Sequence, residues 1–204
     1  MEMPDNRMPK KIIQPFSYQQ SNGSCWITSV HNGLLSLLGS SDKIEHFISR
    51  MFYVITSAEG TDNQEAEILV KLINENKMVC VKGSVIREDH ITETRLRRLL
   101  KKKNSVLIAD TLSGIHSILL LGLVRDDIIA FDPDWRHVKD CKIVKGSFVC
   151  CPYTTENGTL VFNPYYNVHI NIHHFLKART LAAKDQRFVM GAGSSRFIIE
   201  LVKM

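Results

Sequence analysis

Apolar residues in the first half of the chain form runs with helical spacing, and "ITSVHNGLLSLLG", which follows Cys25, is a strongly apolar example. Gly39 is a natural C-terminal stop for this helix, and Asp42 is the expected N-cap of the next one. A fourth run, after residue 91, buries leucines on one side and turns its cations outward. The pattern predicts helices at about 25–38, 42–55, 62–77 and 92–103.

The second half of the chain is built from shorter runs that are rich in β-branched residues and broken by turn residues, which is typical of strands. The pattern predicts a short helix at 173–182 and strands at about 78–86, 105–111, 116–124, 128–132, 142–150, 159–163, 168–172 and 195–202. Helices followed by strands indicate an α+β fold.

Domain organisation follows from length. At 204 residues the chain is long enough for one domain with its own core, so we expect a single domain over 1–204. The segment at about 133–167 carries several turn signals and three prolines. We interpret it as a loop or hairpin excursion from the sheet.

Composition narrows the class of protein only slightly. The net charge of +5 is partly local to "RLRRLLKKKN" at 95–104, where Leu96, Leu99 and Leu100 are expected to face inward. A solvated helix face explains this basic run better than a nucleic-acid-binding role does. No secretory signal is visible, and no apolar run approaches the length of a membrane span. The expected location is the cytoplasm.

The five cysteines are odd in number and lack a framework spacing, which favours thiols over disulfides. Cys150 and Cys151, together with His169, His173 and His174, invite a zinc interpretation, but adjacent cysteines chelate one tetrahedral ion poorly. The "GAGSS" stretch at 191–195 lacks the strand–glycine–helix pattern of a phosphate loop. We therefore expect no metal and no cofactor.

Cys25 in "QQSNGSCW" is the first candidate for chemistry, because the predicted helix begins there. The positive end of a helix favours the thiolate, and the backbone N–H of Cys25 points outward, where it can bind an oxyanion. Gln19 can supply a second donor from its side-chain amide. The alternative is that Cys25 is a small buried hydrophobe and Gln19 an ordinary surface residue.

His116 is the candidate base among eight histidines, since it opens the apolar strand "SILLLGLV". On the return strand, Asp132 becomes its diagonal neighbour on the same face if the turn centres on Arg125, at a backbone separation of about 7–8 Å. A turn shifted by half a residue would place Asp132 on the other face, and Gly122 would allow a bulge there. The alternative for Asp132 is a plain "DPD" turn.

These motifs occur in a recognisable order: "Q-x5-C-W" before a helix, then "HSILLLGL", then "DPDW" sixteen residues after the histidine. The arrangement resembles the papain-like cysteine peptidases. The aspartate followed by proline is similar to the bacteriocin-leader, or double-glycine, peptidases within that group. The resemblance covers about 19–38 and 106–135, and the chain would be a stand-alone form, since it has neither membrane spans nor an ATP-binding motif.

The resemblance implies a papain-like fold, with N-terminal helices packed on an antiparallel sheet. It implies a cysteine peptidase in which Cys25 is the nucleophile, His116 the general base and acid, Asp132 the orienting group and Gln19 the oxyanion donor. The substrate would be a peptide or protein with small residues before the scissile bond. An acyltransferase or amidase using the same triad, or a catalytically silent peptide-binding module, remains an alternative.

Overall fold

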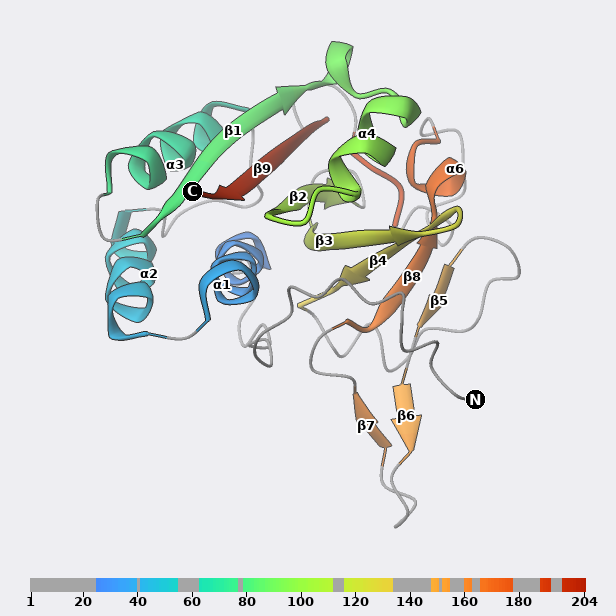
Figure 1. The fold of residues 1–204 in the computed structure, drawn as a ribbon, viewed down its shortest axis with the longest axis horizontal. Helices are drawn as coiled ribbons and strands as arrows, with labels where there is room; N and C mark the ends of the chain where they lie inside the picture. The colour runs from blue at the N-terminus through green and yellow to red at the C-terminus, as the bar shows by residue number, and fades with distance from the viewer. Residues whose placement is uncertain are drawn as a thin grey trace.

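The chain forms a seven-stranded antiparallel sheet with helices on both faces, as a computed structural model shows (Figure 1). The α+β class expected from the sequence is confirmed. The structure describes residues 25–39, 41–54, 63–76, 79–111, 116–133, 148–150, 152–154, 160–162, 166–177, 188–191 and 196–204.

The helices lie close to their expected positions. They are α1 (Cys25–Leu38), α2 (Asp42–Val54), α3 (Asn63–Glu75), α4 (Glu93–Leu100) and α6 (Ile172–Phe175), with a 3-10 turn, η1, at Glu88–His90. The last helix differs from the expected 173–182, because it ends at Phe175 after a single turn capped by Asn171.

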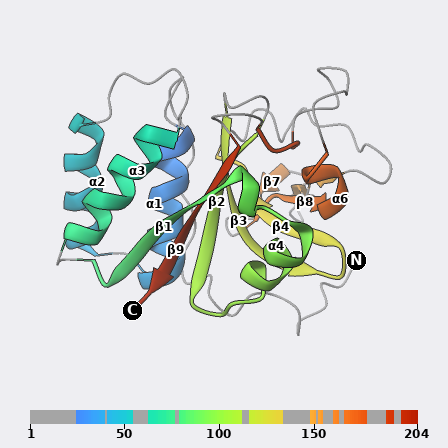
Figure 2. The same ribbon diagram turned by 90° about the horizontal axis from the view of Figure 1, so that it is seen from above.

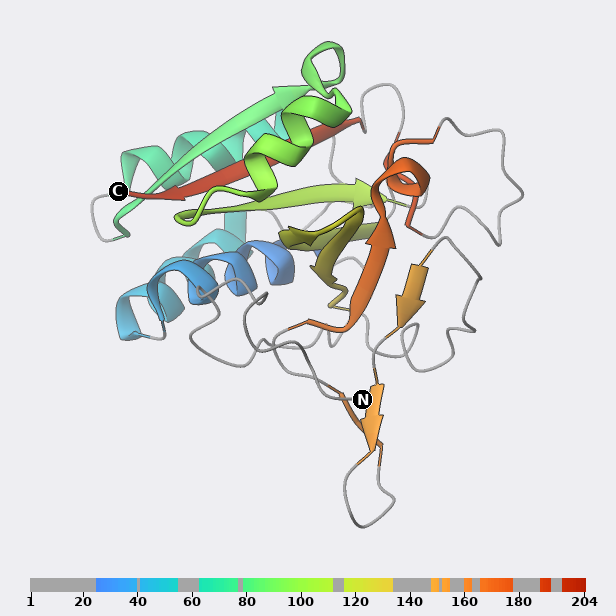
Figure 3. The ribbon, with the colours of Figure 1, turned by 45° about the vertical axis from the view of Figure 1, so that its right-hand side comes forward.

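The strands run in the order β1-β9-β2-β3-β4-β8-β5, and β6 and β7 form a separate pair. Their bounds are β1 (Val81–Arg87), β2 (Ser105–Thr111), β3 (His116–Val124), β4 (Asp127–Phe131), β5 (Phe148–Cys150), β6 (Pro152–Thr154), β7 (Leu160–Phe162), β8 (Val168–Asn171) and β9 (Phe197–Lys203). The strand β6 was not expected from the sequence. Figure 3 shows the β6–β7 hairpin projecting away from the main sheet.

Helices α1, α2 and α3 cover one face of the sheet, and α4 and α6 cover the other (Figure 2). Each face has its own apolar core, because side chains alternate across the strands. Val106 and Leu119 pack toward α1, whereas Leu107 and Leu120 pack toward α4 and α6. Within the described ranges, no helix is long and apolar enough to cross a membrane.

Helix α1 lies directly on the sheet because Gly33 lets the two backbones approach closely. A Cβ atom at Gly33 would come within 3.2 Å of Leu201 and 3.3 Å of Val106. The helix ends as expected at Gly39, whose φ of 81° suits glycine and whose N–H donates to the carbonyl of Leu35. The expected N-cap of α2 is wrong by one residue: Ser41 receives the N–H of Ile44, and Asp42 lies inside the first turn.

An asparagine on α3 anchors the edge strand of the sheet. The side chain of Asn74 accepts a hydrogen bond from the N–H of Gly83 at 2.8 Å and donates one to its carbonyl at 3.1 Å. This bidentate contact fixes β1 against α3.

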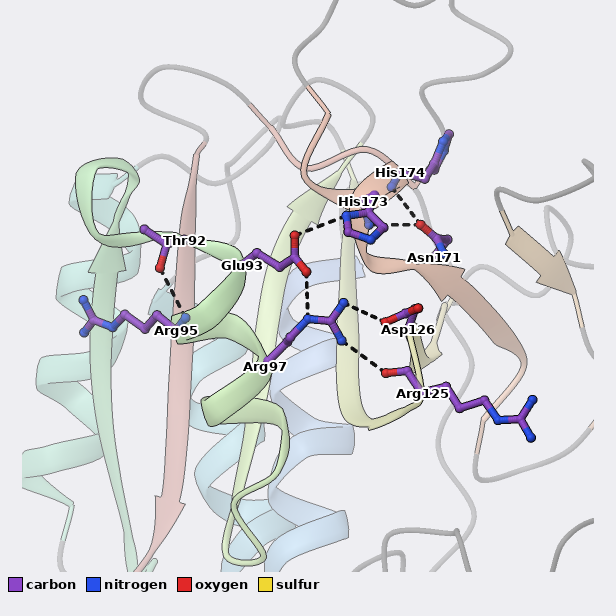
Figure 4. Close-up of polar contacts among 9 residues, drawn as sticks. All are labelled: Thr92, Glu93, Arg95, Arg97, Arg125, Asp126, Asn171, His173 and His174. Carbon is purple, nitrogen blue, oxygen red and sulfur yellow. Dashed lines mark hydrogen bonds and ion pairs between the residues drawn. The ribbon is translucent and has the colours of Figure 1, made fainter.

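A polar network joins α4, the β3–β4 turn and α6 at the surface (Figure 4). Arg97 donates to Glu93 and to Asp126, each at 2.8 Å, and to the carbonyl of Arg125 at 3.2 Å. Glu93 also faces His173, with 3.2 Å between the carboxylate and the ring nitrogen. Three elements that are separate in sequence are thereby held together.

Candidate active site

Cys25 is the first residue of α1, as the sequence predicted, and it is only 6% exposed. The helix behind it is buried along most of its length and packs against β2 and β3. At a helix N-terminus the first-turn N–H groups have no intrahelical partner, and the helix dipole favours negative charge. The side chain of Cys25 therefore lies at the positive end of the α1 dipole.

His116 is the first residue of β3, and its ring meets Asp132 just after β4. The Nε2 nitrogen lies 2.7 Å from Oδ1 of Asp132. The His116 side chain is 11% exposed, and that of Asp132 is fully buried. A charge-assisted hydrogen bond in such surroundings holds the ring in one orientation. It also leaves Nδ1 as the nitrogen that can serve the thiol.

The electrostatics of His116 connect it to both neighbours. Burial, the largest influence, lowers the pKa of His116, because it disfavours the charged ring. The charge and hydrogen bond of Asp132, joined by a hydrogen bond and charge interaction with Cys25, outweigh burial and raise the pKa of His116 to about 10. The imidazolium is therefore the stable form at neutral pH, and it lies between a carboxylate and a thiol.

A β-bulge sets the relative positions of His116 and Asp132. The turn does not centre on Arg125, as expected, but between Arg125 and Asp126, since Val124 pairs with Asp127. That half-residue shift alone would turn Asp132 to the other face. The irregularity between Leu120 and Gly122 restores the expected register, which then pairs Leu119 with Phe131.

Asn167, which the sequence did not single out, holds the backbone of Asp132. Its side chain accepts from the N–H of Asp132 and donates to the Asp132 carbonyl, both at 2.8 Å. Its own N–H donates to the carbonyl of Ala130. The amide thus takes the place of a neighbouring peptide where the β4–β8 ladder ends at Val168. The only sequence signal is a polar residue directly before an apolar strand.

Gln19 lies outside the described residues, so the oxyanion donor stays a prediction. Two of the histidines that were not chosen as the base have contacts of their own. His31 contacts Glu45 at 2.9 Å, and His169 lies against the ring of Tyr166. Burial lowers the pKa of His169, and the charge of Asp127 opposes this.

The zinc interpretation gains no support from the part of the chain that the structure describes. No group of three or more His, Cys, Asp or Glu residues there is arranged to hold a metal ion. His173 faces Glu93 instead, and His174 is buried. Cys151 lies outside the described residues.

Comparisons of the chain with protein-family models, with curated proteins and with solved structures find no match. Any assignment of function therefore has to rest on the geometry and chemistry of the site.

Proposed function

We propose that this protein is a cysteine peptidase with a papain-like arrangement, using Cys25 as nucleophile, His116 as acid and base, and Asp132 as the orienting group. One observation supports the proposal: the buried imidazole of His116, which is hydrogen-bonded to Asp132 at 2.7 Å, also interacts with the thiol of Cys25 at the start of α1. Nucleophile, base and orienting group are the three parts of an activated cysteine site.

The charge state of His116 suits acyl transfer. With a pKa of about 10, the ring is protonated at neutral pH and stabilises a thiolate beside it. The thiolate of Cys25 attacks the carbonyl carbon of a peptide bond, and the carbonyl oxygen becomes an oxyanion. The backbone N–H of Cys25, with Gln19 as the predicted second donor, would stabilise that charge.

Collapse of the tetrahedral intermediate breaks the C–N bond, and His116 gives its proton to the leaving amine. Part of the rise in the pKa of His116 comes from Cys25. That contribution disappears once the sulfur is bonded to the carbonyl carbon in the tetrahedral intermediate, so attack itself makes the ring a better acid. His116 then accepts a proton from water, which attacks the thioester and releases the acid product and the thiolate.

The test begins without any substrate. Iodoacetamide at pH 5.5, followed by mass analysis of the peptides, should label Cys25 in the native protein far faster than Cys80. The comparison is informative because Cys80 is exposed and Cys25 is buried, so accessibility alone predicts the opposite order. His116→Ala should abolish the preference. Labelling of Cys80 ahead of Cys25 in the native protein would refute the proposal.

A second arm tests for peptide cleavage. A panel of short peptides with small residues before the cleavage point is incubated with native protein and with Cys25→Ser, with and without an added amine. Cleavage by the native protein alone, independent of amine, supports the peptidase. Product that forms only with amine would assign the site to acyl transfer, and binding without either reaction would leave a peptide-binding module.

A further inference from the structure

A hydroxyl group on α1 binds the strand that carries His116. The Oγ of Ser29 donates to the backbone carbonyl of Ser117 at 3.0 Å, and both residues are buried. Ser29 is four residues after Cys25, so the two side chains share one face of the helix. Ser117 directly follows His116. This hydrogen bond therefore links the nucleophile's helix to the base's strand, one residue and one helical turn from the reacting groups.

The register of β3 with β4 leads to a proline opposite the carbonyl of Ser117. Successive residues of an antiparallel strand direct their backbone groups to opposite neighbours. The carbonyl of His116 accepts a hydrogen bond from the hydroxyl of Thr111 on β2. The carbonyl of Ser117, the next residue, is therefore directed toward β4. The β3–β4 ladder ends at the pair of Leu119 with Phe131, and the same register continued for two residues beyond the end of β4 would bring Pro133 opposite Ser117. Proline has no N–H to donate, and the hydroxyl of Ser29 takes its place.

Ser117 is also held from β2. Its own hydroxyl donates to the carboxylate of Asp110, which is 2% exposed. Ser117 is thus fixed on its side chain by β2 and on its carbonyl by α1. Without the hydroxyl of Ser29, a buried carbonyl would lose a partner, and α1 would lose a polar contact that sets its position along β3.

We propose that Ser29 is a positioning residue that sets the approach of Cys25 to His116, and that Pro133 acts with it by leaving the Ser117 carbonyl open to α1. This inference rests on the proposed function, because it assigns Ser29 a role in the same thiol–imidazole pair.

The experiment measures the alkylation rate of Cys25 by iodoacetamide between pH 5 and 9 in native protein, Ser29→Ala and Ser36→Ala. Ser36 is a matched control: it is a buried serine on the same helix, but its hydroxyl donates to the carbonyl of Gly33 within α1. At pH 5.5, Ser29→Ala should slow alkylation about fivefold, the equivalent of one hydrogen bond, and Ser36→Ala less than about twofold. Circular dichroism checks that each variant is folded.

Pro133→Ala tests the hydrogen bond between Ser29 and the Ser117 carbonyl by adding a competing donor after β4. The alanine N–H can donate to the Ser117 carbonyl, so adding Ser29→Ala to this variant should cost less than about twofold. A full fivefold loss in both backgrounds would overturn the role of Pro133, and equal effects of Ser29→Ala and Ser36→Ala would overturn that of Ser29. His116→Ala separates the two proposals. If it leaves the rate unchanged, the proposed function fails; if it slows the reaction and Ser29→Ala does not, only the positioning role fails.

Discussion

Two regions of this protein place a histidine beside a carboxylate, with different consequences. His116 and Asp132 meet at 2.7 Å, with side chains that are 11% and 0% exposed. His173 and Glu93, which Figure 4 shows, meet at 3.2 Å, with side chains that are 60% and 39% exposed. The first pair is buried, and its histidine interacts with Cys25 at the start of α1. The second is part of a network open to solvent.

The two pairs have the same types of residue, so it is their surroundings that distinguish the pair proposed to be reactive from the pair at the surface. Exposed ion pairs are screened by water and salt, and each contributes about 0–1 kcal/mol. A buried pair interacts more strongly, and removing one partner leaves the other charge uncompensated. The surface network holds α4 near α6, while the buried pair keeps an imidazolium beside a thiol.

The largest effect should come from removing the buried carboxylate. Asp132→Ala leaves His116 without its partner, so the alkylation of Cys25 at pH 5.5 should fall on the order of 100-fold, since breaking a buried charged pair costs several kcal/mol. Asp132→Asn should be milder, because its amide oxygen still accepts from Nε2. Glu93→Ala, the matched change in the surface pair, should alter the rate less than about twofold. Equal losses in Asp132→Ala and Glu93→Ala would remove the distinction between the two pairs.

An intermediate effect is expected from Asn167. Asn167→Ala deletes two buried hydrogen bonds to the backbone of Asp132, which should lower the free energy of unfolding by about 2–3 kcal/mol and slow Cys25 alkylation about tenfold. Asn74→Ala removes the same bidentate contact from Gly83, away from the site, and should reduce stability without changing the rate. Urea unfolding and alkylation measured on both variants give the comparison. A rate loss in Asn74→Ala that matched Asn167→Ala would show that stability alone governs the thiol.

The last expected effect is on stability rather than on rate, and it is a slope of stability against pH. The pKa of His116 is raised in the folded protein to about 10 from 6.5, so folding is favoured by the bound proton. That contribution is fully present below pH 6.5 and is lost as pH rises through about 10. Urea midpoints across pH 6 to 10.5 should therefore decline more steeply for the native protein than for His116→Ala. His173→Ala should keep the native slope, and a flat native curve would contradict the raised pKa.

The sequence singled out the proposed nucleophile and the proposed base because each is the first residue of a secondary-structure element. Cys25 opens an apolar run with helical spacing, and His116 opens a continuous apolar strand. Local patterns of this kind predict where an element starts. They also placed the helices and most strands, with β6 missed because a strand of three residues that begins with proline leaves almost no pattern.

The remaining parts of the site depend on contacts between distant segments. Asp132 reaches His116 only because a bulge at Leu120–Gly122 compensates for the half-residue shift of the β3–β4 turn. The sequence allowed that bulge without requiring it. Asn167 is 35 residues away from Asp132 in the sequence, and Ser29 is 88 residues away from Ser117. Such pairings are determined by the packing of the whole sheet, which local periodicity does not encode.

The contact between Asn74 and Gly83 has a consequence for association between molecules. Strand β1 lies at the end of the sheet order, and a bare edge strand offers its N–H and C=O groups to any incoming strand. Near the middle of β1, the amide of Asn74 already occupies the outward N–H and carbonyl of Gly83. A second chain would have to displace that amide before it could extend the sheet, so the helix that covers β1 also protects this edge against fibril growth.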